Sequence, residues 1–254
     1  MTFQALIFDV DGTLADTERD GHRVAFNQAF AAAGLDWEWD IALYGELLAV
    51  TGGKERMLHY LDRYRSDYQR PVDLNGLIAQ LHAAKTRHYT NLLAQGGIPL
   101  RPGVRRLLNE ARARNVRLAI ATTTTPENVT ALLRQTISEQ AISWFEVIGA
   151  GDAVAAKKPA PDIYDYVLQK LNLPPAQCLA FEDSENGLRA ANAAGIKTVV
   201  TVNDYTATHD FSGAAIVLDH LGEPDQPFHL LSPPSVNGAT LVDLNFLSKL
   251  HATA

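Results

Sequence analysis

The stretch that decides the fold is FDVDGTLADTE, residues 8–18, in which an apolar run leads directly into two aspartates. Asp9 and Asp11 stand one residue apart and are followed at once by Gly12 and Thr13. Two carboxylates this close repel each other, so folding alone does not favour the pattern. The pair therefore indicates chemistry at the end of a strand, with a bound cation, a covalent reaction, or both.

Short apolar runs recur along the chain, each typical of a buried strand in a parallel sheet. They are residues 4–10, 116–122, 145–151, 177–183 and 197–202, with a weaker run at 214–221. Helical patterns separate them, at residues 102–115, 126–137, 159–172 and 184–195. Because strands alternate with helices, we predict an α/β protein with a Rossmann-like parallel sheet.

A long insertion follows the first strand. Residues 17–95 show an almost continuous helical pattern, which is too long for a single crossover between neighbouring strands. We therefore predict an inserted helical cap with hinges near residues 15–18 and 96–103. The predicted division places the core at residues 1–15 and 97–225, the cap at 16–96, and a C-terminal extension of unassigned role at 226–254.

Composition and charge exclude several classes of partner. The formal net charge of -7 argues against a nucleic-acid-binding protein, which would carry a basic face. The only cysteine, Cys178, lies in an apolar run, which indicates packing in a reducing compartment. No apolar run approaches the roughly 18 residues of a membrane span, and the N-terminus lacks the basic start of a signal peptide. We expect a cytoplasmic monomer that acts on a small molecule and binds neither nucleic acid nor membrane.

The residues at the strand ends form one chemical set. Ligands of an open α/β sheet bind beyond the carboxyl ends of its strands. The polar residues predicted there are Asp9, Asp11, Thr122, Thr123, Glu182 and Asp183, with Lys158 in the loop after a further strand. Clustered carboxylates favour a hard cation such as Mg²⁺. One aspartate could then attack phosphorus while the other serves as general acid and base, and a hydroxyl and an ammonium would bind the phosphate oxygens.

Four segments resemble the four motifs of the haloacid dehalogenase-like superfamily, in order. They are FDVDGT (8–13), ATTTT (121–125), KKPAPDIY (157–164) and FEDSENGLRAA (181–191). The resemblance implies that Asp9 is the nucleophile and Asp11 the general acid and base, with Thr122 and Lys158 as further catalytic residues. It also implies a Mg²⁺ ion held by Asp9, the Asp11 carbonyl, Glu182 and Asp183, and a small helical cap after the first motif.

The cap contains a candidate anion site in VTGGKERM, residues 50–57. Gly52 and Gly53 allow a ligand to approach the backbone, and Lys54 and Arg56 follow where a helix begins. An ordinary glycine-rich turn with solvated charges is the alternative. His82 and Lys85 share one face of a later helix, which suggests a second phosphate. We expect the other cap histidines, His22, His59 and His88, to be structural or solvated.

Within the superfamily, the cap resembles that of the CbbY-type phosphatases. These enzymes are linked to the Calvin cycle of carbon dioxide fixation and act on xylulose-1,5-bisphosphate, an inhibitor of Rubisco. The resemblance lies in residues 16–30, 51–56, 100–104, 121–129 and 157–171, and it leaves open whether Glu18 or Asp20 contacts the substrate. The substrate contacts that it implies are Glu18, Tyr44, Thr51, Gly52, Gly53, Lys54, Glu55, Arg56, His82, Lys85, Thr123 and Asn128.

Other functions share these core motifs. β-Phosphoglucomutase has the same motifs and cap but moves the phosphoryl group between hydroxyls of glucose phosphate, so only the cap distinguishes it, and TGGKER favours the phosphatase. Phosphonoacetaldehyde hydrolase needs a Schiff-base lysine in an apolar shell, which nothing marks around Lys54. A haloacid dehalogenase would leave Asp11 without a leaving group to protonate. A non-catalytic binding module would be expected to lack Asp9, Asp11 or Lys158.

Overall fold

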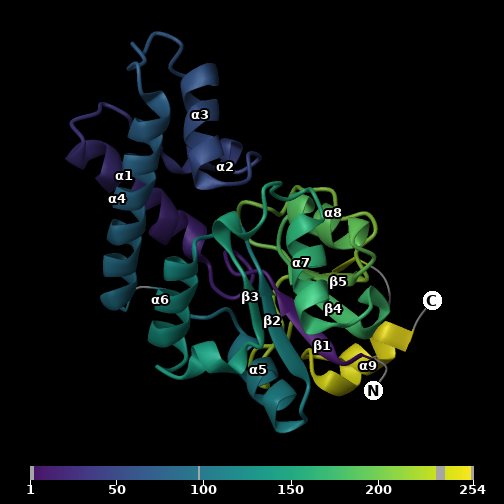
Figure 1. Ribbon diagram of the computed structural model, residues 1–254. Helices are drawn as coiled ribbons and strands as arrows, with labels where there is room; N and C mark the ends of the chain where they lie inside the picture. Colours follow the sequence, from purple (N-terminus) through teal and green to yellow (C-terminus); the bar gives the residue numbers. More distant parts are fainter. Residues whose placement is uncertain (1–2, 97, 233–237, 253–254) are drawn as a thin grey trace.

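The computed structural model describes residues 3–96, 98–232 and 238–252. Its centre is one seven-stranded sheet in the order β3-β2-β1-β4-β5-β6-β7 (Figure 1). The strands are β1 (Ala5–Phe8), β2 (Arg117–Ala121), β3 (Val147–Gly149), β4 (Cys178–Glu182), β5 (Lys197–Thr201), β6 (Ile216–Leu218) and β7 (Leu230–Ser232). All neighbouring strands are parallel except β6 and β7, so the predicted fold class is confirmed.

Strand β1 lies inside the sheet, between β2 and β4, and is buried on both faces. Ala5 pairs with Arg117 of β2 on one side and with Cys178 of β4 on the other. Leu6 and Phe8 pack into the core on one face, and Ala5 and Ile7 pack into the core on the opposite face. This alternation follows from the two-residue period of a strand and explains why the whole run is apolar.

Helices cover both faces of the sheet. On one face lie α5 (Val104–Ala113), α6 (Pro126–Thr136) and α9 (Leu244–Ala252), which contribute Leu107, Leu132 and Leu247 to the larger core cluster. On the other face lie α7 (Asp162–Leu171) and α8 (Glu185–Ala193). Shorter helical turns are 141–144, 151–153 and 175–177. At the start of α8 the Ser184 side chain accepts a hydrogen bond from Gly187 N, as expected for an N-cap residue.

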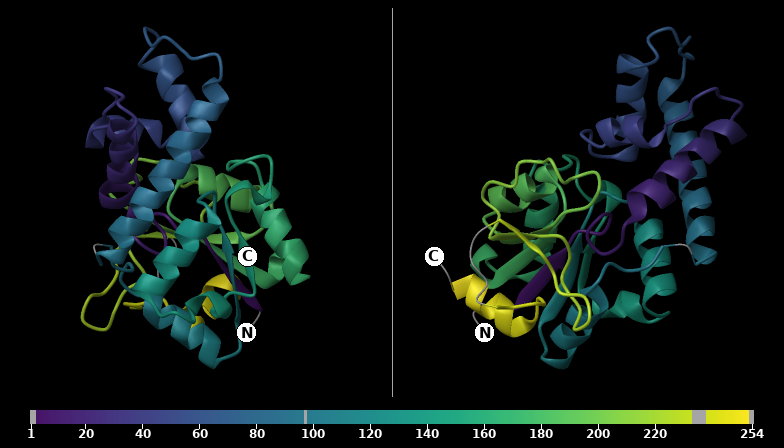
Figure 2. Two further views of the ribbon diagram at one scale, coloured as in Figure 1. Left: turned by 60° about the vertical axis from the view of Figure 1, so that its left-hand side comes forward. Right: turned by 180° about the vertical axis from the view of Figure 1, so that it is seen from behind.

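The helices between β1 and α5 project from the sheet, as both views in Figure 2 show. They are η1 (Glu18–His22), α1 (Arg23–Ala32), α2 (Ile41–Leu47), α3 (Gly53–Arg63) and α4 (Leu74–Ala94). Their own apolar cluster includes Phe26, Phe30, Trp37, Trp39 and Tyr60. Because aromatic rings bury large areas, this cluster gives the helices a packing centre separate from that of the sheet.

The C-terminal residues extend the core. Strand β7 adds an antiparallel edge to the sheet, and α9 packs Leu244, Leu247 and Leu250 against the core cluster. The Phe3 and His251 rings lie 5.7 Å apart in an edge-on arrangement. Residues 233–237 of the predicted extension, and residue 97 of the predicted hinge, lie outside the described residues.

Candidate active site

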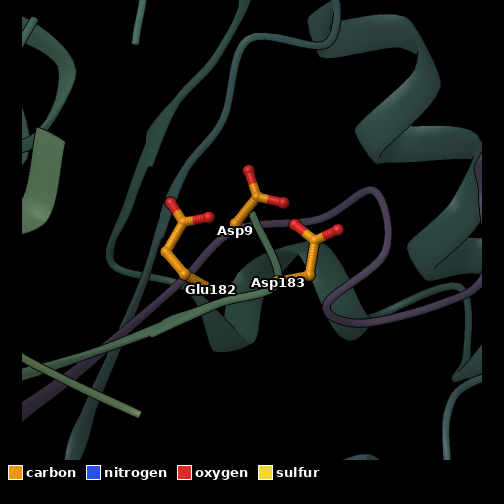
Figure 3. A group of neighbouring side chains, drawn as sticks. All are labelled: Asp9, Glu182 and Asp183. Carbon is orange, nitrogen blue, oxygen red and sulfur yellow. The ribbon is translucent and has the colours of Figure 1, made fainter. Parts of the chain in front are cut away.

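Parallel pairing of β1 with β4 brings the first and fourth motifs together. Asp9 N donates to Phe181 O at 3.0 Å, which continues the sheet one residue past β1. The carboxyl groups of Asp9, Glu182 and Asp183 therefore gather at one edge of the sheet (Figure 3). One oxygen from each of the three lies within 4.8 Å of the others, and all three residues are buried. The structure thus brings together three of the carboxylates that were predicted to meet at the strand ends.

Lys158 is placed among these carboxylates. Its Nζ donates to Asp9 Oδ1 at 2.7 Å, to Glu182 Oε1 at 2.6 Å and to Ala121 O at 2.9 Å. These three acceptors match the three protons of an ammonium group. Lys157, by contrast, donates to Gly151 O and Asp152, away from the cluster. The geometry therefore favours Lys158 over Lys157 as the lysine of the third motif.

The charge balance of the cluster is negative. Burial, together with the charges of Glu182 and Asp11, raises the pKa of Asp9 to about 8 despite the nearby Lys158. Burial and the charges of Asp9 and Glu182 also raise the pKa of Asp183 well above its ordinary value. For Lys158, burial opposes the charged form, but Asp9 and Glu182 outweigh it and raise its pKa. Three buried carboxylates facing one ammonium leave an excess of negative charge that a cation would balance.

Asp11 points away from this cluster. Its Oδ1 accepts from Thr17 Oγ1 at 2.5 Å and from His22 Nε2 at 2.8 Å. Burial by itself would raise the pKa of Asp11, but the charge and hydrogen bond of His22 and the bond from Thr17 outweigh it and hold the pKa below its ordinary value. The two aspartates of the first motif thus have different surroundings, as different chemical roles require.

His22 was not predicted as a functional residue, yet it is buried and contacts Asp11. Its Nδ1 lies 2.9 Å from Lys85 Nζ. Because an ammonium can only donate, Nδ1 accepts from Lys85 and Nε2 donates to Asp11 when the His22 ring is neutral. Of the two settings expected for His22, solvated and structural, burial excludes the solvated one, and the ring holds the side chain of the general acid and base candidate in place.

The second motif follows β2 and lines the same edge. Thr122 Oγ1 accepts from Thr124 N at 3.3 Å, and Asn128 Nδ2 donates to Thr124 Oγ1 at 3.1 Å. Asn128 is buried, and its Oδ1 has no hydrogen-bond partner within the described part of the chain. A buried amide oxygen without a partner is costly, so it is suited to accept from a ligand.

Two adjoining cavities open onto these residues. The larger measures about 290 Å³ and is lined from the core by Asp9, Asp11 and Lys158 and from the cap by Glu18 and Arg56. A smaller space of about 40 Å³ shares Asp11, Glu18 and Arg56 with it. The predicted residues that line the larger cavity also include Thr51, Thr122, Thr123 and Asp183, and those that line the smaller one also include Gly52, Gly53, His82, Lys85, Thr123 and Asn128.

A hydrogen-bonded chain within the cap fixes Glu18. Tyr44 OH donates to Glu18 Oε2 at 2.5 Å, and Arg56 Nη1 donates to Tyr44 OH at 3.0 Å. The Arg56 guanidinium also lies 5.3 Å from the centre of the Tyr44 ring. Tyr44 is absent from both cavity linings and thus acts on the cavity through Glu18. Of the two open choices, Glu18 lines the cavities, whereas Asp20 lies in a neighbouring hollow.

Two basic residues of α4 face the smaller cavity. Lys85 is only 4% exposed, and burial lowers its pKa to about 8 although Asp11 and Glu18 oppose this. Burial and the charges of Lys85 and Lys54 lower the pKa of His82 to about 4. A desolvated ammonium gains most from an anion, so this face of the cap is suited to a phosphate.

Four predicted site residues line neither cavity: Tyr44, which acts through Glu18, and Lys54, Glu55 and Glu182. Lys54 Nζ instead donates to Asp152 Oδ2 at 2.7 Å, which links α3 to the loop after β3. Glu55 is exposed, with its carboxylate folded over Gly52. Glu182 lies behind the cavity wall, where its Oε1 accepts from Lys158 and from Tyr164 OH. In this arrangement the Lys54 and Glu55 side chains do not reach the cavities, so the substrate contacts expected of them stay predictions.

The arrangement fits a hard divalent cation. The donor set consists only of carboxylate oxygens, which Mg²⁺ prefers. Glu182 Oε2 is buried and has no hydrogen-bond partner among the described residues. Gly12, at φ +83°, has no Cβ, and one would lie 2.2 Å from Asp183 Oδ2. Because residue 12 is glycine, the backbone of the first motif lies directly against the Asp183 carboxylate, beside the carboxylate cluster.

Comparison with known proteins identifies the family. Residues 3–195 match the model of the haloacid dehalogenase-like hydrolase family. The chain therefore belongs to the haloacid dehalogenase-like hydrolases. The resemblance noted in the four motifs is confirmed.

Among its relatives, the chain is 52% identical over 236 residues to protein CbbY of Cupriavidus necator, which covers 93% of this chain and 91% of that protein. A crystal structure of CbbY from Rhodobacter sphaeroides with phosphate superposes with a TM-score of 0.79 at 49% identity, covering 86% and 94% of the two chains. A mutant of that protein, 48% identical, was solved with xylulose-(1,5)bisphosphate. A phosphorylated carbohydrates phosphatase of Thermotoga maritima is 31% identical over 84% of this chain and 94% of its own length.

The family and these relatives show a phosphatase, which confirms the predicted enzyme class. A β-phosphoglucomutase of Clostridium difficile superposes with a TM-score of 0.72 at 19% identity, which shows the shared fold alone. Among the described helices, none has both the length and the apolar character needed to cross a membrane.

Proposed function

We propose that this chain is a Mg²⁺-dependent sugar-phosphate phosphatase that converts xylulose-1,5-bisphosphate to xylulose 5-phosphate. The observation that carries the proposal is the Lys158 ammonium held between Asp9 and Glu182 at the floor of a cavity whose cap wall includes the buried Arg56. The CbbY structure solved with xylulose-(1,5)bisphosphate supports the choice of substrate. By the same resemblance, the enzyme would remove an inhibitor of carbon dioxide fixation.

In the proposed reaction Asp9 is the nucleophile. One Asp9 oxygen forms a bond to phosphorus as the bond from phosphorus to the sugar C1 oxygen breaks, and Asp11 gives its proton to that leaving oxygen. Water then attacks the aspartyl-phosphate, Asp11 takes up its proton, and inorganic phosphate leaves. Lys158 and the Thr122 hydroxyl would donate to the oxygens of the phosphoryl group during transfer.

The surroundings of Asp11 favour its carboxylate form, which the second step uses. The first step uses the acid form, so Asp11 must take up a proton when substrate binds. An approaching phosphate supplies the cause, because a nearby negative charge raises the pKa of a carboxyl group.

The cation would be held by Asp9, Asp183 and the Asp11 carbonyl, with Glu182 direct or through water. When bound, Mg²⁺ would offset the negative charge of the cluster and of the transferring phosphoryl group. The chain's own part is to keep these oxygens together, through the pairing of β1 with β4, and to exclude water by burial.

The cap would select the substrate. Arg56 and Lys85, both buried, are the cations nearest the smaller cavity and would hold the distal phosphate, and Glu18 would accept from sugar hydroxyls. Lys54 would join them only after release from Asp152. We further infer that residues 16–96 act as the cap over the core, residues 1–15 and 97–225.

The test is phosphate release by the purified protein with Mg²⁺. The substrates are xylulose-1,5-bisphosphate, its epimer ribulose-1,5-bisphosphate and β-glucose 1-phosphate. We expect turnover of the xylulose compound with little release from its epimer, and loss of at least about 10⁴-fold in Asp9→Asn, since the nucleophile is removed. EDTA should abolish turnover and added Mg²⁺ restore it.

Conversion of β-glucose 1-phosphate to glucose 6-phosphate, with neither bisphosphate cleaved, would contradict the assigned substrate and favour the mutase. Activity that survives both EDTA and Asp9→Asn would contradict the assigned site.

A further inference from the structure

The loop after β5, residues 203–209, reaches the carboxylate cluster from a part of the chain that carries none of the four motifs. Asn203 Nδ2 donates to Asp183 Oδ2 at 2.7 Å. Asn203, Tyr205, Thr206 and His209 all line the larger cavity. This loop therefore contributes to the site, although its sequence, NDYTATH, has no feature that would have predicted it.

The orientation of the Asn203 amide is determined by its own loop. Asn203 Oδ1 accepts from Tyr205 N at 3.0 Å, which closes an Asx turn. Because the oxygen of the amide is used in this way, the group that faces Asp183 must be the NH₂. Asn203 N in turn donates to Thr206 Oγ1 at 3.0 Å, and Thr206 N donates to Asn203 O at 3.0 Å. Asn203 is thus held in place before any ligand binds.

This bond decides which oxygen of Asp183 is available. Oδ2 accepts from Asn203 and lies against Gly12, where a Cβ would come within 2.2 Å of that oxygen and 2.7 Å of Asn203 Nδ2. With Oδ2 committed, Oδ1 is the remaining oxygen. A hydrogen bond of this kind from outside the ligand shell fixes the rotation of a carboxylate and typically changes metal affinity 10–100-fold.

The same loop is anchored to the cap. The Tyr205 and Tyr44 rings lie 6.0 Å apart at 68°, and the Tyr205 ring packs against Gly45 of α2, where a Cβ would meet it at 3.1 Å. At the other end of the loop, Glu185 N donates to His209 Nδ1 at 3.3 Å, beside the start of α8. The loop therefore connects the cap helix α2 to the backbone that follows Asp183.

We propose that Asn203 is a positioning residue for the cation ligand Asp183, and that Tyr205, packed on α2, keeps Asn203 in place. The inference rests on the proposed cation site and adds to it a connection between the seating of the cap and the affinity of the core for the cation. Such a connection is reciprocal, so binding of the cation would also favour the seated cap.

The experiment measures Mn²⁺ binding to the full chain without substrate, by the electron paramagnetic resonance signal of free Mn²⁺. Asn203→Ser keeps a side-chain acceptor for the Tyr205 N–H but cannot reach Asp183, and we expect its Kd for Mn²⁺ to rise at least about 10-fold. Asp204→Asn is the matched control, because Asp204 is an exposed neighbour in the same loop whose ion pair, at 3.7 Å, is with Arg19 and not with the carboxylate cluster. Its Kd should stay within about twofold of wild type.

Two further readouts separate positioning from a general structural role. In Asn203→Ser the Mn²⁺ concentration for half-maximal phosphatase activity should rise with the Kd, while kcat at saturating Mn²⁺ recovers to within about fivefold. Tyr205→Ala should raise the Kd about threefold, and the double variant should bind no more weakly than Asn203→Ser, because coupled residues are non-additive.

Wild-type affinity in Asn203→Ser, or equal weakening in Asp204→Asn, would overturn the role of Asn203 and leave the phosphatase proposal intact. Additive losses in the double variant would overturn the role of Tyr205. A wild-type protein that hydrolyses phosphate esters but binds no Mn²⁺ or Mg²⁺ would instead overturn the proposed cation site and this inference with it.

Discussion

Lys158 Nζ lies 2.7 Å from Asp9 Oδ1, although the two residues are 149 positions apart in the chain. The contact exists because β1 and β2 are neighbours in the sheet and the loop after β3 returns Lys158 to the same edge, where it also donates to Ala121 O at the end of β2. The buried ammonium is thereby fixed beside the proposed nucleophile, where it can both lower the charge repulsion among the carboxylates and face the incoming phosphate.

Lys158→Met is expected to lower kcat by about 10²–10³-fold, the usual cost of removing one donor to a developing negative charge. The measurement is phosphate release from a chromogenic phosphate monoester. Lys157→Met is the matched control, because Lys157 contacts Gly151 and Asp152 instead of the cluster. Equal losses in the two variants would refute the assignment of Lys158.

Tyr164→Phe is expected to destabilise the fold by about 1–3 kcal/mol, because Glu182 Oε1 loses a buried donor and retains only Lys158. Urea unfolding at pH 7 measures the change. Tyr166→Phe, on the same helix, should change the free energy of unfolding by less than about 0.5 kcal/mol. A Tyr164 variant as stable as wild type would show that this hydroxyl is dispensable to Glu182.

His82→Gln is expected to reduce the loss of stability in acid. The pKa of His82 is about 4 in the folded chain, below its ordinary 6.5, so the unfolded chain takes up the proton first as the pH falls. Wild type should therefore lose about 2 kcal/mol more than His82→Gln between pH 7 and pH 5. Urea unfolding at the two pH values tests this, and parallel losses would show that His82 is not buried in its neutral form.

Gly12→Ala should lower activity at least about 10²-fold, because a Cβ there would displace Asp183 and small displacements at a reacting centre are costly. Gly34→Ala is the control. Gly34 also has a positive φ, of +70°, but nothing lies within 4 Å of its Cβ position. It should cost about 1–2 kcal/mol of stability from backbone strain and leave kcat unchanged. Comparable activity in the two variants would mean that the approach of Gly12 to Asp183 does not matter.

The sequence by itself determined the sheet, the inserted helices and the residues at the strand ends. Apolar runs six to eight residues long predict buried strands, and the parallel order follows from the helices between them. Asp9, Asp11, Thr122 and Lys158 were predictable because each lies in a short motif next to a strand, where local spacing fixes its place at the sheet edge. The strand limits were less accurate: residues 145–151 form a strand only at Val147–Gly149.

Only the tertiary structure decided which isolated polar residues complete the site. His22 and Asn203 are single side chains in otherwise ordinary segments, and Tyr164 ends the third motif without an expected role; each contacts a motif residue between 11 and 20 positions away. The tertiary structure also decided that Lys54 pairs with Asp152 while Lys85 faces the smaller cavity, although the sequence predicts a phosphate contact for both lysines. The physical reason is that periodicity and motif spacing report local backbone geometry, whereas the partner of a polar group is chosen by packing between elements that are distant in the chain.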